Sequence, residues 1–310
     1  RKPASAVVIG GGFIGVEIAE NLIHKGIRTS VVEAAPQVLA PLDPEMASLV
    51  AKEMRSHGVD LHLGVAAQTI SETSVTLTNG VEIPAELVIL AIGVRPDTSL
   101  AKEGGLAVGE RGGIAVDEFN RTSNPDVYAI GDAAEKRDAL DGSSTLVPLA
   151  NIANRHGRVV ADHIAGREVR PVLTIGTAIV KVFNLAIAAT GWNEKRLAAS
   201  GRTFTSIHTH PNSHAGYYPG AKQMQLKLIF DPTTGEIFGA QGVGTDGVDK
   251  RIDVIATAIR AGLTAPELAD LELAYAPPFG SAKDPVNMLG YIAENVSTGL
   301  VKTAQWSEID

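Results

Sequence analysis

The order of apolar and polar positions predicts a strand, a helix and a second strand at the start of the chain. Residues 7–9 form a short apolar run that is typical of a buried strand, and a second strand at 29–33 ends in Glu33. Between them, apolar residues recur at helical spacing at Ile14, Ile18, Leu22 and Ile23. We therefore expect a first βαβ unit over residues 5–33.

Further patterns extend this unit into a sheet domain that ends at Gly93. The expected elements are a helix at 43–57 with Pro44 at its first position, a strand at 60–63, an antiparallel meander at 68–71, 74–78 and 81–83 with a tight turn at Asn79–Gly80, and a doubly buried parallel strand at 87–93. The meander replaces a crossover helix.

The rest of the chain changes character twice. Residues 124–132 are expected to form a strand ending in Gly131 and Asp132, and Pro148, Leu149 and Ala150 to open a helix to about Ile164, with Arg155, His156 and Arg158 on its polar side. After Gly166 we expect a β-rich stretch at 172–190, helices at 193–199, 248–261 and 266–271, and strands at 203–209, 224–230 and 237–241. This predicts domains at 1–93, 94–168 and 169–310, the last of them α+β.

The stretch from Gly10 to Gly15 has the spacing of a dinucleotide-binding turn. Gly10 permits a tight turn, Gly12 lets the backbone approach a pyrophosphate, and Gly15 lets the helix pack close to the strand. Backbone N–H groups and the helix dipole then face an anion. The alternative is that these glycines serve only a tight turn.

Glu33 ends the second strand, where a carboxylate accepts hydrogen bonds from the adenosine ribose. Its charge would repel a 2′-phosphate, so NADH is expected over NADPH. NADPH stays possible because Arg28 lies at the other end of the same strand.

Composition narrows the class of protein. The 310 residues include 27 basic and 35 acidic ones, a net charge of −8, which argues against a nucleic-acid surface. No apolar run is long enough to span a membrane. The chain has no cysteine and hence no internal disulfide, which suits a cytoplasmic location. We expect no metal site at His208, His210 and His214, and solvated side chains for Lys250 and Arg251.

By Asp132 the order of motifs resembles that of the flavin-dependent pyridine nucleotide-disulfide oxidoreductases, over nearly the whole chain. The resemblance rests on residues 10–17, 91–96 and 122–132. It implies an α/β fold: a Rossmann-like NAD domain with an antiparallel meander, the remainder of an FAD-binding domain, and a C-terminal α+β dimerisation domain that forms a homodimer.

The resemblance also implies roles for particular residues. Asp132 would hydrogen-bond the ribityl chain of FAD, and the helix that begins at Pro148 would point its N-terminus at the flavin. Phe13 matches an aromatic gate over the nicotinamide pocket, and Glu17 an acid that reaches toward a flavin-side lysine. The alternatives are core packing for Phe13 and a solvated helix face for Glu17. The remaining cofactor-binding positions are Ile14, Gly93, Gly131, Leu149 and Ala150.

Two tyrosine-bearing segments, 214–220 and 274–285, resemble those of coenzyme A disulfide reductases and NADH-dependent persulfide reductases. Such enzymes use one redox cysteine that alternates between a thiolate and a mixed disulfide with CoA, beside two tyrosines of the partner subunit. Tyr217 and Tyr275 are the matches, with Tyr218 as the substitute for the first. A phenol can donate a proton to a departing thiolate. Alternatively, the tyrosines only pack an interface.

The resemblance implies an electron path from NADH through FAD to that cysteine, which reduces CoA disulfide, CoA persulfide or polysulfide. The cysteine and the first FAD glycine motif are absent here, so we expect a fragment, truncated at both ends, with both features in a preceding portion of about 100–150 residues. The tail at 305–309 resembles the start of a rhodanese domain. The alternatives are an NADH oxidase or peroxidase of the same fold and an inactive, cysteine-free dimerisation scaffold.

Overall fold

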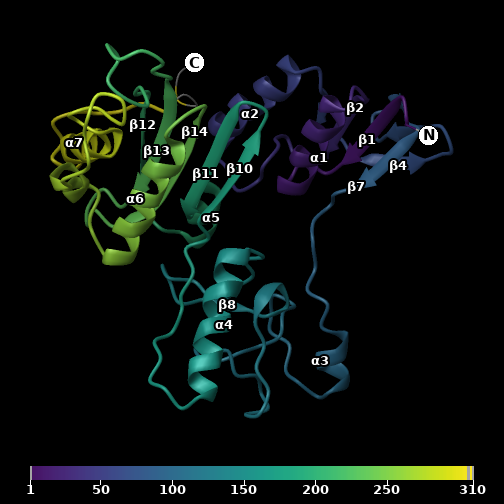
Figure 1. Ribbon diagram of the computed structural model, residues 1–310, viewed down its shortest axis with the longest axis horizontal. Helices are drawn as coiled ribbons and strands as arrows, with labels where there is room; N and C mark the ends of the chain where they lie inside the picture. The colour runs from purple at the N-terminus through teal and green to yellow at the C-terminus, as the bar shows by residue number, and fades with distance from the viewer. Residues whose placement is uncertain (1, 306–307, 309–310) are drawn as a thin grey trace. The chain divides into compact units, whose positions relative to one another are not determined.

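The computed structural model describes residues 2–305 and residue 308. It divides into two compact units, Arg1–Gly93 with Ile179–Asp310, and Val94–Ala178 (Figure 1). No helix within the described ranges is long and apolar enough to cross a bilayer. Of the tail expected to resemble the start of a rhodanese domain, Trp306, Ser307 and Ile309 lie outside the described residues.

The first unit begins with a four-stranded parallel sheet, in the order β3-β2-β1-β7. Its elements are β1 (Ser5–Ile9), α1 (Phe13–His24), β2 (Arg28–Glu33), α2 (Pro44–Ser56), β3 (Asp60–Leu63) and β7 (Leu87–Leu90). Because the strands are parallel, their C-terminal ends meet along one edge, and there β1 leads into the glycine turn. The βαβ unit and the helix begun by Pro44 are confirmed.

Along the chain, an antiparallel meander follows β3 and precedes β7, as predicted. It consists of β4 (Ala67–Ile70), β5 (Ser74–Leu77) and β6 (Glu82–Pro84), with Gly80 in the left-handed region at a φ of 84°. Val75 and Leu77 of β5 pack against Val7 and Val32 of the parallel sheet. The meander therefore covers part of one sheet face.

The last strand of the parallel sheet corrects the prediction for residues 87–93. The strand ends at Leu90, whose side chain is 62% exposed, and Ile92 beyond it is 74% exposed. Among the described strands β7 pairs with β1 alone, so it forms an edge of the sheet. A doubly buried strand was inferred from an unbroken apolar run, which does not reveal whether neighbours cover both faces.

Residues from 178 onward build a five-stranded antiparallel sheet covered by helices. Its order is β10-β11-β14-β13-β12, from β10 (Ala178–Val182), β11 (Leu185–Gly191), β12 (Thr205–Thr209), β13 (Met224–Phe230) and β14 (Ile237–Gly244). The helices are α5 (Glu194–Ser200), α6 (Val248–Ala261), α7 (Pro285–Ser297) and the short 3-10 helix η2 (Pro266–Asp270). Helix α7 was not predicted, although Asp284 before Pro285 is a typical helix start.

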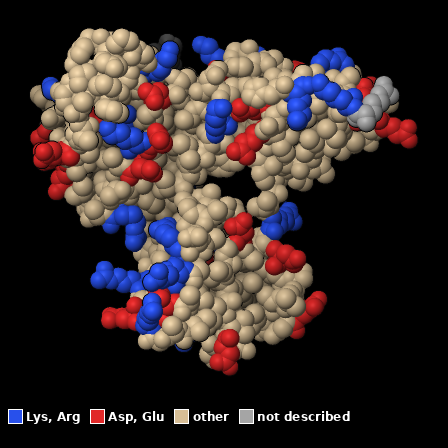
Figure 2. Space-filling view, in the orientation of Figure 1, with Lys and Arg blue, Asp and Glu red and all other residues tan. Residues whose placement is uncertain are grey.

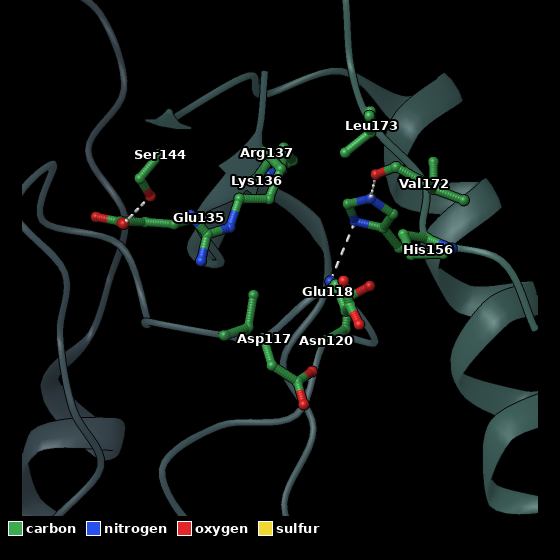
Figure 3. Close-up of a pocket in the computed structure, with 12 residues that line it drawn as sticks. Asp117, Glu118, Asn120, Glu135, Lys136, Arg137, Ser144, His156, Val172 and Leu173 are labelled. Atoms are coloured by element: carbon green, nitrogen blue, oxygen red, sulfur yellow. Dashed lines mark hydrogen bonds between the residues drawn. The ribbon is translucent and has the colours of Figure 1, made fainter. Parts of the chain in front are cut away.

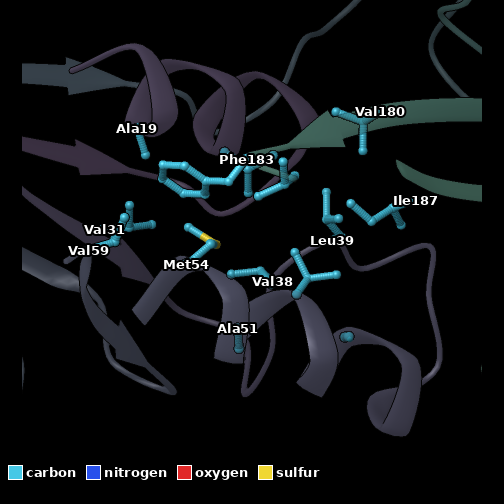
Figure 4. Packing of buried hydrophobic residues seen from close by; sticks show 14 of the residues in the cluster. Ala19, Val31, Val38, Leu39, Ala51, Met54, Val59, Val180, Phe183 and Ile187 are labelled. Atoms are coloured by element: carbon cyan, nitrogen blue, oxygen red, sulfur yellow. The ribbon is translucent and has the colours of Figure 1, made fainter. Parts of the chain in front are cut away.

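The two parts of this unit share one hydrophobic core. Phe183, at the turn between β10 and β11, reaches between Ala19 of α1 and Met54 of α2 (Figure 4). Its ring stacks on that of His57, with centroids 4.2 Å apart. Its backbone N–H donates to the Glu20 carboxylate at 2.8 Å. The C-terminal sheet is thus anchored in the domain that holds the parallel sheet.

The second unit contains little regular structure. Its elements are α3 (Ser99–Glu103), the 3-10 turn η1 (Gly131–Ala133), β8 (Lys136–Arg137), β9 (Ser144–Thr145) and α4 (Ala150–Ile164). The strand predicted at 124–132 is wrong, because within the described residues this stretch makes only an isolated bridge between Arg121 and Tyr128. His156 is also misplaced by the prediction: it is buried, whereas a polar helix face was expected.

Candidate functional site

The three glycines of the turn after β1 have different surroundings. Gly10 has a φ of 114°, and a Cβ there would lie 2.2 Å from the Ala91 carbonyl oxygen. A Cβ on Gly15 would lie 1.9 Å from the Gly10 carbonyl oxygen, so α1 can approach the strand only with glycine at this position. A Cβ on Gly12 would meet no atom within 4 Å. The turn is therefore closed at Gly10 and Gly15 and open at Gly12.

Helix α1 starts directly behind this opening. Gly12 is its N-cap, and no side chain caps its first N–H groups, which suits an anionic ligand. Phe13 is partly buried and packs against the shared core, whereas Ile14 is 49% exposed. Glu17 is exposed on the same helix. This placement fits the predicted gate for Phe13 as well as core packing, and it leaves Glu17 accessible.

The carboxylate of Glu33 folds back onto the glycine turn. It accepts hydrogen bonds from the backbone N–H groups of Gly11 and Ala35, both at 2.7 Å. Each carboxylate oxygen keeps a second lone pair for a ribose hydroxyl. Glu33 thus also shapes the turn, a role that the sequence pattern did not predict.

In the second unit, Gly131 and Asp132 form the 3-10 turn η1. Gly131 has a φ of 75°, and Asp132 is exposed. From the buried side, the Lys136 ammonium donates to the carbonyls of Gly131 at 2.6 Å and Ala134 at 2.9 Å. Burial lowers the pKa of Lys136, and the charge of Asp132 opposes this. Lys136 therefore fixes the turn while Asp132 stays accessible.

Helix α4 packs against this turn and presents an uncapped N-terminus. Leu149 is its N-cap, and the flanking Pro148 and Ala150 are exposed. No acidic residue stands in the first turn, so no local charge offsets the positive end of the helix dipole. Gly93, the remaining predicted cofactor position, is exposed at the end of the first sheet domain with a φ of 100°.

A polar pocket of the second unit was not predicted (Figure 3). The His156 ring nitrogens contact the Asn120 amide at 3.3 Å and the Val172 carbonyl at 3.2 Å, and burial lowers the pKa of His156. Glu135 accepts a hydrogen bond from the Ser144 hydroxyl. These polar groups are all paired within the protein, so the pocket offers structural contacts and no evident reactive group.

The two predicted tyrosines lie together. The phenol oxygens of Tyr217 and Tyr275 are 3.2 Å apart, and their side chains are 78% and 48% exposed. The hydrogen bond between the two phenols raises the pKa of Tyr275 from its usual 10.0. Tyr218 instead packs edge-on against His214. One phenol of the pair donates to the other, so the pair presents one O–H that can donate to an acceptor outside the chain.

A buried ionic cluster was missed by the sequence pattern. The Lys227 ammonium contacts carboxylates of Asp43 at 2.9 Å, Glu45 at 2.5 Å and Glu194 at 2.7 Å. Burial lowers the pKa of Lys227, but the Coulombic attraction of Asp43 and the hydrogen bonds to the acids outweigh it and raise the pKa overall. His208 bonds Glu45 at 3.1 Å. A single lysine inside the apolar strand 224–230 was the signal that could have revealed the cluster.

Charged side chains also lie at the surface, and Figure 2 shows both basic and acidic residues on the visible face. Among the described residues, no group of three or more His, Cys, Asp or Glu side chains could hold a metal ion.

These features define a dinucleotide-binding α/β protein. The opening at Gly12, the uncapped α1 and the carboxylate of Glu33 fit the pyrophosphate and ribose of a nicotinamide dinucleotide. The exposed Asp132 and the uncapped α4 fit the hydroxyls and the electron-rich edge of a flavin.

Comparison with known families leads to the same class. Residues 1–157 match the pyridine nucleotide-disulphide oxidoreductase model, and residues 177–285 match the dimerisation domain of that family. The chain belongs to the pyridine nucleotide-disulphide oxidoreductase family. The predicted family and α/β fold class are thereby confirmed, and the family implies FAD and NAD(P)H as cofactors.

Two curated relatives show which members of the family the chain is similar to. The chain is 34% identical over 298 residues to the NAD(P)H sulfur oxidoreductase (CoA-dependent) of Pyrococcus furiosus, covering 94% of this chain and 66% of the relative. It is 31% identical over 297 residues to the coenzyme A disulfide reductase of Staphylococcus haemolyticus, covering 96% and 67%. The chain thus spans about two thirds of the length of these relatives.

Two solved structures are similar to this chain in fold and sequence. The crystal structure of reduced Bacillus anthracis CoADR-RHD matches with a TM-score of 0.98 and 51% identity, covering 99% of this chain and 56% of that one. An NAD-dependent persulfide reductase from A. fulgidus matches with a TM-score of 0.95 and 39% identity, covering 98% and 57%.

Proposed function

We propose that this chain is the nucleotide-binding and dimerisation part of a flavoenzyme that uses NAD(P)H to reduce CoA disulfide, CoA persulfide or polysulfide. The observation that carries the proposal is the hydrogen-bonded pair Tyr217–Tyr275, which sits on the two segments that resemble such reductases. The printed names of the relatives from Pyrococcus furiosus and Staphylococcus haemolyticus support this branch.

The net reaction with CoA disulfide converts NADH, a proton and one disulfide into NAD⁺ and two CoA thiols. When bound, FAD would accept a hydride from NADH and pass two electrons on to a disulfide. The turn at Gly12 would orient the dinucleotide, and Asp132 with α4 would hold the flavin. The exposed, hydrogen-bonded pair of Tyr217 and Tyr275 would donate one proton or hydrogen bond to the departing thiolate.

The reaction needs a redox cysteine, and the chain has none. A second copy of these residues lacks it too, so we propose that the cysteine lies in the part of the whole protein that this chain does not cover, since the chain spans about two thirds of the length of its relatives. The exposed tyrosines and the dimerisation domain at 177–285 fit a second subunit that brings this cysteine to them. We propose a homodimer in which Tyr217 and Tyr275 of one subunit serve the cysteine of the other. Full turnover by a well-folded monomer would exclude this arrangement.

For the cofactor we propose NADH before NADPH, on the basis of Glu33. Hydrogen bonds from the backbone of Gly11 and Ala35 hold its carboxylate at the glycine turn, and a negative charge there would repel a 2′-phosphate. The Glu33→Gln variant keeps an acceptor and removes the charge, so the preference for NADH should shrink. An unchanged ratio of kcat/KM values for the two nucleotides would count against this role. A cytoplasmic location also stays a prediction.

The test measures NADH consumption by the protein that carries this chain together with its flavin and cysteine. Rapid consumption with CoA disulfide, CoA persulfide or polysulfide, and slow consumption with oxygen alone, supports the proposal. The reverse result selects the rival oxidase, a name carried by a Methanocaldococcus jannaschii relative with 35% identity. If NADH is not consumed with any of these acceptors, the result supports the inactive scaffold.

A further inference from the structure

The two tyrosines lie on irregular segments, so their contact needs support from elsewhere. Residues 214–223 and 271–284 contain no helix or strand. Even so, the backbone N–H of Ala215 donates to the Gly280 carbonyl at 2.8 Å, which ties the two segments together. One further group, the guanidinium of Arg251, contacts the residues at the base of both segments, Ser213 and Asp284.

Arg251 is buried although it carries a charge, contrary to the expectation of a solvated side chain. It is 1% exposed, on the apolar face of α6 beside Val248, Ile252 and Ile255. A buried guanidinium is costly unless its N–H groups are paired. Its partners therefore show what its burial achieves.

The Arg251 guanidinium joins the bases of the two tyrosine segments. One amino group donates to the Ser213 carbonyl at 2.9 Å, just before the Tyr217 segment. The same group and Nε bond the two oxygens of Asp284, at 2.9 Å and 3.3 Å, at the end of the Tyr275 segment. The other amino group donates to the Gly247 carbonyl at 3.2 Å.

Asp284 is itself fixed on its other side. It is 3% exposed and is the N-cap of α7, where it accepts the Val286 N–H at 3.1 Å. Asn287 completes the capping box by accepting the Asp284 N–H at 3.2 Å. The bidentate ion pair Arg251–Asp284 thus connects α6, α7 and both tyrosine segments.

We propose that Arg251 and Asp284 are positioning residues that hold Tyr217 and Tyr275 in hydrogen-bond contact for proton donation to the departing thiolate. The proposal rests on the proposed function. The planar fork of arginine is required, because a lysine ammonium cannot bond Asp284 at two points and Ser213 at the same time. The raised pKa of Tyr275 supports the geometry, since it depends on the Tyr217 phenol.

The experiment compares Arg251→Lys and Asp284→Asn with Arg260→Lys, an exposed position in the last turn of the same helix. The pKa of the Tyr275 phenol is followed by NMR of tyrosine-labelled holoenzyme without substrate, with Tyr275→Phe assigning the signal. We expect the pKa to fall toward 10 in Arg251→Lys and Asp284→Asn and to stay raised in Arg260→Lys.

Kinetics provide the second readout. A proton donor displaced by about 1 Å costs on the order of 10- to 100-fold in rate, so kcat for disulfide reduction should fall by that factor in both variants. The rate of flavin reduction by NADH should stay within about twofold of the parent's, since the glycine turn is untouched. Arg260→Lys should match the parent in both steps.

A raised Tyr275 pKa that persists in folded Arg251→Lys and Asp284→Asn would overturn the positioning role. So would equal losses in the two kinetic steps, which indicate general structural damage. The phenol titration uses no substrate. It therefore still judges the positioning role if the parent enzyme proves inactive toward CoA disulfide, a result that would refute only the proposed function.

Discussion

The ammonium nitrogen of Lys227 lies 2.9 Å from a carboxylate oxygen of Asp43, and these side chains are 1% and 0% exposed. Lys227 belongs to β13 of the C-terminal sheet, while Asp43 is the N-cap of α2 in the nucleotide-binding part. The contact therefore joins the same two parts as Phe183. Gln241 of β14 adds a hydrogen bond to Asp43 at 2.6 Å.

Replacing Lys227 with Met should lower the free energy of unfolding by about 3–5 kcal/mol, because it leaves buried carboxylates without their cation. Urea unfolding at neutral pH measures the loss. Lys181→Met is the matched control, since that side chain is 75% exposed and lies 3.9 Å from Glu20. The control should lose less than about 1 kcal/mol. Similar losses in both variants would contradict a buried, energetically coupled cluster.

Glu45 should make part of this stability depend on pH. Burial tends to raise its pKa, but hydrogen bonds from His208 and Lys227 prevail and lower the pKa from 4.5 to about 2. A folded-state pKa below the unfolded value means that ionised Glu45 stabilises the fold above pH 4.5. This stabilisation is lost as the pH falls from 4.5 toward about 2.

The variant Glu45→Gln isolates this contribution. At neutral pH it should be less stable than the parent by up to about 3 kcal/mol, and the difference should shrink as the pH falls below 4.5. Comparing variant with parent is necessary because burial raises the pKa of neighbouring Asp43, which has the opposite pH dependence. Unfolding curves at a series of pH values provide the measurement. A difference that does not change with pH would exclude the role.

Phe183 offers a test that separates side-chain packing from backbone strain. Its side chain is 3% exposed, and its φ of 52° lies in the left-handed region that disfavours residues with a Cβ. Phe183→Ala should cost about 3–5 kcal/mol of unfolding free energy, because the ring leaves a cavity. Phe183→Gly loses the same ring but should be more stable than Phe183→Ala by about 1 kcal/mol. The reverse order would show that the turn conformation changes.

Sequence periodicity correctly predicted the elements whose apolar residues recur at regular spacing and pack against a neighbouring element. The βαβ unit, the meander and α6 belong to this class. It failed where the outcome depends on distant partners: residues 124–132 lack a strand ladder within the described residues, and His156 is enclosed by Asn120 and Val172. A local pattern contains no information on either relationship.

Charged residues in apolar patterns were a signal that the sequence offered; we expected Arg251 to be solvated and made no prediction for Lys227. Arg251 falls on the apolar stripe of α6, and Lys227 interrupts an apolar strand. Both are buried because carboxylates from distant segments, Asp284 and Asp43, meet them there. Tyr217 and Tyr275 were found through a resemblance, whereas their mutual hydrogen bond joins residues 58 positions apart in the chain, which no local pattern reveals.

The glycine turn allows stability and nucleotide binding to be tested separately. Gly15→Ala should destabilise the protein by about 3 kcal/mol or more, because its Cβ would lie 1.9 Å from the Gly10 carbonyl oxygen. Gly12→Ala should cost less than about 1 kcal/mol, since Gly12 has a φ of −76° and its Cβ would meet no atom within 4 Å.

If the opening at Gly12 receives the pyrophosphate, the methyl group of Gly12→Ala occupies the space that the ligand needs. NADH affinity should then fall at least about tenfold, or about 1.4 kcal/mol, while the thermal midpoint barely changes. Gly80→Ala is the control for binding only: its methyl group also meets no atom within 4 Å, in the distant turn of the meander, and its NADH affinity should equal the parent's although the φ of 84° makes this variant less stable. Fluorescence titration with NADH measures both variants. Undiminished NADH binding by Gly12→Ala would show that the dinucleotide does not approach the backbone at this glycine.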